Sequence, residues 1–279
     1  MRTMPTTPVP VASDAEHRGR FSDLFAFEWI KLFAQRSTYV MLGLALLMSI
    51  GGAWLTSGGV HLVNASARAG YDRVSGSFSE GTFAFLTIGA GALGALSMVG
   101  EFSSGLIRTT FIAVPDRRRI VLAKAAVLAS VTTAAGLVAA VASFVTAQSI
   151  LGPRQLGISF GNPLVLQAFL ASVLLVPVSA IIGMFIGALI RIPVASFFTV
   201  FVAQSLLADA IPSNSGNHLL AAISDAMPRN AWFGLVSQHT AFDNDGPFPP
   251  GALQCWVALL AWPLLALLLT LLVVRRRDV

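Results

Sequence analysis

Long apolar runs separated by short polar segments are the feature that most restricts what this chain can fold into. The run 164–190 contains no charged residue, and about twenty such residues are enough for a helix to cross the hydrocarbon core of a bilayer. Over 279 residues the chain is 55% hydrophobic and only 11% charged, so the runs leave no soluble region with a core of its own. The sequence therefore predicts an all-α polytopic membrane protein.

We expect six transmembrane helices, preceded by a flexible cytoplasmic tail over 1–20 and an amphipathic interfacial helix over 21–37. The transmembrane domain is predicted over 38–279. Its approximate spans are 38–56, 81–99, 125–148, 164–190, 193–211 and 252–274. The longest external loop is predicted over 212–251, where the apolar stretches 219–227 and 231–236 indicate short helices at the outer interface.

The basic residues set the orientation of these spans. Six spans place both termini on one side, and all but four of the eighteen lysines and arginines lie on that side. Cytoplasmic segments of membrane proteins carry an excess of Lys and Arg, so both termini are predicted to be cytoplasmic. The four external ones are Arg68, Arg73, Arg154 and Arg229.

The segment 100–124, GEFSSGLIRTTFIAVPDRRRIVLAK, is the most charged connection between two apolar runs. A charged side chain at the bilayer centre costs roughly 2.5–3.5 kcal/mol, so we expect a cytoplasmic loop here. Apolar residues near helical spacing, with Gly105 between them and Pro115 after them, predict a short helical hairpin that could pass a push from a partner into the membrane. Alternatively, the arginines at 117–119 only fix the topology.

The segment 21–36, FSDLFAFEWIKLFAQR, has an aromatic and apolar arc, with Glu28 and Lys31 mostly on the opposite side. This division indicates a helix along the cytoplasmic leaflet, with Trp29 at headgroup level. Packing on a partner protein is the alternative, and the two are compatible.

No catalytic motif is visible. Neither lysine follows a glycine, so the chain has no P-loop of its own, and H-E-x-x-H and G-x-S-x-G are absent. The single cysteine, Cys255, excludes an intrachain disulfide and any multi-cysteine metal site. We predict no catalytic residue, no metal and no directly bound cofactor. The net charge of +5 fits anionic lipid and membrane orientation better than nucleic acid.

Polar residues within the predicted spans are few. Asp209, near the outer end of the fifth span, is the candidate for a functional intramembrane acid, as an ion-driven carrier would need. Gln204, like Gln148 and Gln167, either faces a substrate path or hydrogen-bonds between helices. Glycines at 89, 91 and 94, and the Gly183-x-x-x-Gly187 pair, predict close helix packing.

Two local patterns carry a resemblance to a known family. Residues 27–38, FEWIKLFAQRST, and residues 101–110, EFSSGLIRTT, followed by Pro115, Arg119 and Lys124, resemble the membrane permease subunits of type-2 ATP-binding-cassette exporters. Leu106 stands where this family more often has Thr. The resemblance covers the whole chain in topology.

The resemblance implies a six-helix permease in a bacterial plasma membrane, paired with a second copy or a sister permease. Two separate P-loop ATPase subunits would use ATP below it. Segment 21–37 would be the connecting helix and 212–251 an external gate. The residues implied in coupling are, in the loop, Glu101, Phe102, Gly105, Arg108, Pro115, Arg117, Arg118, Arg119 and Lys124, and, in the connecting helix, Glu28, Trp29 and Lys31.

Two other functions fit the sequence. One is an ion-gradient-driven carrier that uses Asp209, and the other is a membrane immunity or resistance protein that binds its target through 212–251. The apolar spans do not indicate which substrate is transported. The sequence also leaves open whether the permease forms a homodimer or a heterodimer.

Overall fold

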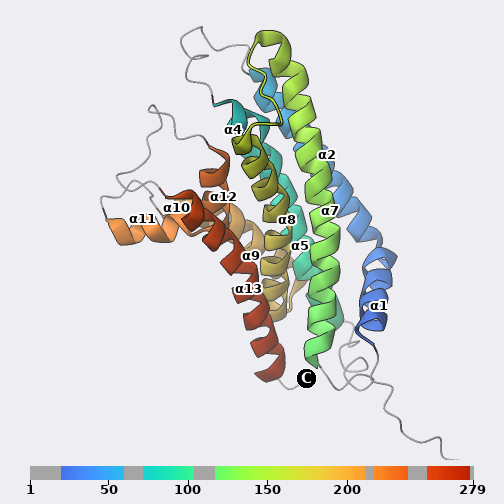
Figure 1. The fold of residues 1–279 in the computed structure, drawn as a ribbon. Coiled ribbons are helices and arrows are strands. Elements are labelled where there is room, and N and C mark those ends of the chain that lie inside the picture. Colours follow the sequence, from blue (N-terminus) through green and yellow to red (C-terminus); the bar gives the residue numbers. More distant parts are fainter. Residues whose placement is uncertain (1–19, 60–71, 104–116, 212–216, 238–249, 277–279) are drawn as a thin grey trace, which may run out of the picture.

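The structure is a computed structural model that describes residues 20–59, 72–103, 117–211, 217–237 and 250–276. Its described residues are mainly helical and form no β-strand (Figure 1). The elements are α1 (Phe21–Ala34), α2 (Arg36–Gly59), α4 (Arg73–Ser77), α5 (Glu80–Ser103), α7 (Arg117–Leu151), η2 (Gly152–Arg154), α8 (Pro163–Ile190), α9 (Pro193–Phe201), η3 (Val202–Leu206), α10 (Leu207–Ala210), α11 (His218–Asp225), α12 (Pro228–Val236) and α13 (Ala252–Arg276).

Five helices in the described part of the chain are long and apolar enough to cross a membrane. They are α2, α5, α7, α8 and α13, and they contain the predicted spans 38–56, 81–99, 125–148, 164–190 and 252–274. The remaining predicted span, 193–211, is divided among α9, the π-helical η3 and α10. The count of six spans therefore stays a prediction.

Helices α2 and α7 run opposite to α5, α8 and α13, so that one end of the bundle collects α1, the end of α5, the start of α7 and the end of α13 (Figure 1). Leu32 of α1, Met98 of α5, Val121 of α7 and Val274 of α13 belong to one buried apolar cluster at this end. The two ends of the described chain thus lie on the same side of the bundle. The cytoplasmic placement of both termini stays a prediction.

Helices α5 and α8 form the tightly packed centre of the bundle. A Cβ atom added at Gly94 would lie 1.9 Å from the carbonyl oxygen of Ala180, and one added at Gly183 would lie 1.9 Å from that of Gly91. Because lipid supplies little hydrophobic drive between helices, such backbone approach is what gives the pair its van der Waals contact. The predicted close packing of small residues is confirmed.

The opposite end of the bundle is covered by α4 and α12. Trp232 of α12 is fully buried, and its indole Nε1 donates to Ser172 Oγ of α8 at 2.9 Å. Helices α11 and α12 match the two short helices predicted within 212–251, whose residues 212–216 and 238–249 lie outside the described part.

The α5–α8 contact predicts the effect of one added methyl group. Gly183→Ala should destabilise the protein by about 1–3 kcal/mol, because the methyl group meets a backbone carbonyl that cannot move freely. Thermal unfolding in detergent, followed by tryptophan fluorescence, measures this as a lower melting temperature. Gly43→Ala, where no atom lies within 4 Å, is the matched control and should melt at or slightly above the wild-type temperature. Equal melting of the two variants would contradict the close contact.

Candidate functional site

Helix α1 lies beside the lower part of α7 at the end of the bundle (Figure 1). Its first turn is stabilised by Asp23, whose carboxylate accepts a hydrogen bond from the backbone N–H of Arg20 at 3.2 Å. At its other end, Thr38 Oγ1 donates to the carbonyl oxygen of Leu32 at 2.8 Å and fixes the corner between α1 and α2. These contacts set which face of α1 meets the bundle.

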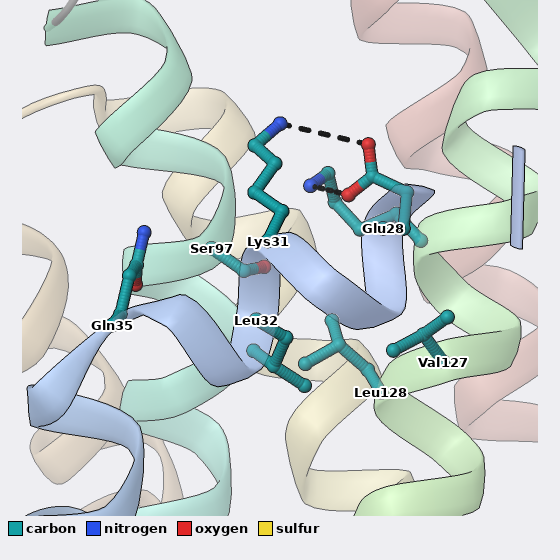
Figure 2. A pocket seen from close by; sticks show the side chains of 8 residues that line it. Glu28, Lys31, Leu32, Gln35, Ser97, Val127 and Leu128 are labelled. Carbon is teal, nitrogen blue, oxygen red and sulfur yellow. Dashed lines mark hydrogen bonds and ion pairs between the residues drawn. The ribbon is translucent and has the colours of Figure 1, made fainter. Parts of the chain in front are cut away.

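That face carries charge. Glu28 and Lys31 of α1 meet Glu101 from the last turn of α5 and Lys124 from the second turn of α7, and we call these four residues the ion cluster. Lys124 Nζ lies 2.5 Å from Glu28 Oε2 and 2.6 Å from Glu101 Oε1. Lys31 Nζ pairs with Glu101 and lies 3.5 Å from Glu28 Oε1. Figure 2 shows Lys31 and Glu28 joined in this way above Leu32.

The ion cluster is almost fully removed from solvent. Glu28, Glu101 and Lys124 are each only 4% exposed, and Lys31 is partly exposed. Two negative and two positive charges cancel within it, which is the condition under which charges are tolerated at low dielectric. The adjoining cavity has a volume of about 20 Å³, room for roughly one water molecule. The cluster is therefore a junction between three helices rather than a ligand site.

This geometry differs from the sequence expectation in two respects. The polar side of α1 is turned inward, because Glu28 finds its counter-charge on α7. The predicted loop 100–124 is shorter in the structure, since residues 100–103 continue α5 and residues 117–124 begin α7. Glu101 and Lys124 therefore lie on helices, where they are held in place.

The other predicted coupling residues are placed as follows. Trp29 is 40% exposed on the outer face of α1, consistent with a position at the membrane interface. Arg118 and Arg119 are exposed in the first turn of α7. Gly105, Arg108 and Pro115 lie outside the described residues, as does the side chain of Arg117.

The contact between Arg191 and Phe102 was not predicted from the sequence. It ends α8 in a left-handed conformation with φ of 63°, and its guanidinium lies 4.1 Å from the centre of the Phe102 ring. A cation over an aromatic ring is attracted by the ring quadrupole. The sequence shows an arginine and a phenylalanine on the same predicted side of the membrane, but not that α5 and α8 bring them together.

The predicted intramembrane polar residues lie elsewhere. Gln204 is in the π-helical η3 and lies against Gly91 of α5, away from the ion cluster. The side chain of Asp209 is outside the described residues. Gln148 donates to Ser77 Oγ at 3.2 Å and Gln167 donates to the carbonyl oxygen of Leu235 at 3.1 Å, so both hydrogen-bond between segments. Within the described ranges, no group of three or more His, Cys, Asp or Glu side chains is placed to bind a metal ion.

Comparison with known protein families gives a match over most of the described helices. A family described as ABC-2 family transporter protein matches residues 24–204, from α1 to η3. The matched stretch contains all four residues of the ion cluster and also Gln204. No individual curated protein matches the chain.

Removing one charge from the ion cluster should leave another buried and unpaired. Lys124→Met is expected to cost about 3–5 kcal/mol of stability, which is on the order of 10 °C in melting temperature. The double variant Glu28→Gln/Lys124→Met again has equal charges, in Lys31 and Glu101, and should recover at least half of that loss. Thermal unfolding in detergent measures both.

Arg275→Met, at an exposed position near the end of α13, controls for the loss of a cation and should change stability by about 0.5 kcal/mol or less. If the single and double variants are equally unstable, the four charges do not compensate one another as described.

Proposed function

Because the chain belongs to the ABC-2 family of transporter proteins, we propose that it is the permease subunit of an ATP-driven exporter, with ATP hydrolysed by a separate P-loop ATPase subunit. The chain supplies the membrane domain. The ATPase docks on the cytoplasmic segment that joins α5 to α7. This division of labour agrees with the lack of a P-loop in the sequence.

The observation that carries the proposal is the ion cluster. Glu101, in the last turn of α5, and Lys124, in the second turn of α7, flank the proposed docking segment, and the 2.6 Å ion pair between their side chains joins the two helices. Both residues also pair with α1. A push on the segment therefore cannot move the end of α5 without acting on α7 and α1.

Arg191 provides a second connection, between the last turn of α5 and the end of α8. Phe102 follows Glu101 in the last turn of α5, and its ring supports the guanidinium at the turn between α8 and α9. Movement at the docking segment thereby reaches the helices that follow α8. Such a chain of packed side chains is a physical route for coupling.

The outer face of α1 fits the proposed lipid contact. Phe27, Trp29 and Ile30 are exposed on this helix while Glu28 is buried against the bundle. An exposed apolar face on a helix at the end of a membrane bundle is suited to the boundary between headgroups and acyl chains. We propose that α1 lies at the cytoplasmic leaflet of a bacterial plasma membrane, and that a second permease, identical or related, completes the transporter.

Purification from the native membrane tests the proposal. A tagged copy of the chain should bring down a P-loop ATPase subunit in comparable amount. Arg108→Glu, in the proposed docking segment, should reduce the recovered ATPase at least tenfold, because the reversed charge removes a cation from the docking surface. Quantitative mass spectrometry of the purified complex measures the ratio.

The matched control is Arg73→Glu, at the start of α4 on the opposite end of the bundle, which should leave the ratio unchanged. Membrane insertion is compared for all three proteins. Loss of the ATPase with Arg73→Glu but not with Arg108→Glu would reverse the proposed orientation. Transport by a preparation that holds no P-loop ATPase would exclude the proposal.

A further inference from the structure

A cavity of about 600 Å³ lies in the half of the bundle away from the ion cluster. It is bounded by the first two turns of α5, the middle of α8, the π-helical η3, α12 and α13. Its volume falls within the range of about 300–1,000 Å³ that small-molecule sites occupy. The whole cavity is formed by one copy of the chain.

Aromatic side chains give the cavity apolar walls. Phe83, Phe185, Trp232 and Trp262 line it. Both indole N–H groups are already used: Trp232 Nε1 donates to Ser172 Oγ at 2.9 Å, and Trp262 Nε1 donates to the carbonyl oxygen of Ala226 at 2.6 Å. The rings therefore offer apolar surface rather than hydrogen bonds, which suits the hydrocarbon part of a ligand.

The charges that line the cavity neutralise each other. Glu80 and Arg229 are its charged lining residues, and they form an ion pair. Arg229 Nη1 also donates to the carbonyl oxygen of Ser205 at 3.2 Å. A charged ligand would lose its hydration in the cavity and would find no unpaired charge of opposite sign among these two residues. An uncharged ligand is therefore favoured.

Gln204 supplies a polar group with unused hydrogen-bonding capacity. It lines the cavity, and its Nε2 atom is buried without an acceptor among the described residues. The amide lies so close to α5 that a Cβ atom at Gly91 would come within 2.3 Å of Nε2. It stands in the π-helical turn, a backbone form that occurs frequently at functional sites. Because Nε2 is packed against α5, the Gln204 side chain has to turn toward the cavity before a carbonyl or hydroxyl oxygen on a ligand can accept its hydrogen bond.

We propose that this cavity binds an uncharged amphiphilic molecule, with its apolar body among the four aromatic rings and an acceptor oxygen on the amide of Gln204. The site deepens the proposed function, since a ligand held here is a candidate for the exported molecule. Binding itself requires no ATPase.

Photolabelling of the full chain in phospholipid nanodiscs tests this site. The probe is N-decylacetamide with a diazirine in its alkyl chain, and decanoate with the same diazirine is the charged comparison. The amide probe should label peptides of α5, α12 and α13 saturably, as mapped by mass spectrometry, and decanoate should label them at least fivefold less. Gln204→Leu should weaken saturable labelling by the amide roughly fivefold, the effect of one lost hydrogen bond.

Ala203→Phe, in η3, and Ala84→Phe, in α5, each place a large side chain in the cavity wall and should each reduce labelling at least tenfold. Leu264→Phe, on the exposed face of α13, is the matched control and should not. Melting temperatures identify any variant that fails to fold. If one cavity-filling variant does not fold, labelling of the other one tests the site. Unsaturable labelling that both variants leave unchanged would overturn the site, and equal labelling by decanoate would overturn its preference for an uncharged ligand.

A competition arm identifies the source of the ligand. If added phosphatidylcholine competes saturably with the probe, a bilayer lipid occupies the cavity, and if it does not, the site takes a molecule other than this lipid. The assay contains no ATPase. Failure of photolabelling would leave the proposed export function standing, and failure to recover an ATPase would leave the binding site standing.

Discussion

The mutual compensation of the four charges of the ion cluster, three of them buried, is the constraint on which the arrangement of this bundle depends. Apolar helices in lipid gain little from the hydrophobic effect when they meet, so close backbone packing and polar contacts have to set their relative positions. Lys124 is only 4% exposed, so Glu28 and Glu101 have to neutralise its charge in place of water. A shift of α7 along its neighbours would break these ion pairs. The ion cluster therefore fixes how far α1, α5 and α7 extend relative to one another.

Helix α5 connects the features described above. Its C-terminal end carries Glu101 in the ion cluster, its middle packs through Gly91 and Gly94 against α8, and its N-terminal end carries Glu80 at the wall of the large cavity. A tightly packed helix transmits displacement along its length better than a loosely packed one. The proposed docking side and the proposed ligand site are thus opposite ends of one rigid element.

The sequence predicted the elements of this fold better than their contacts. Apolar length located five of the long helices, and small residues located the α5–α8 contact, since both depend on local composition. The family resemblance implied coupling roles for Glu28, Lys31, Glu101 and Lys124 but divided them between a helix and a loop. Their pairing joins residues up to 96 positions apart, which no periodicity within one helix reports. The π-helical turn at Gln204 was missed for a related reason, because it extends an otherwise regular helical pattern.

The ion cluster also determines the amine chemistry of the protein. The chain has two lysines, Lys31 and Lys124. Both form ion pairs at the junction between α1, α5 and α7, so every side-chain amine is engaged there. Lys124 in particular is shielded from reagents as long as α1 stays seated. Acylating agents that target primary amines would consequently act as reporters of conformation, modifying Lys124 only in molecules whose first helix has lifted away.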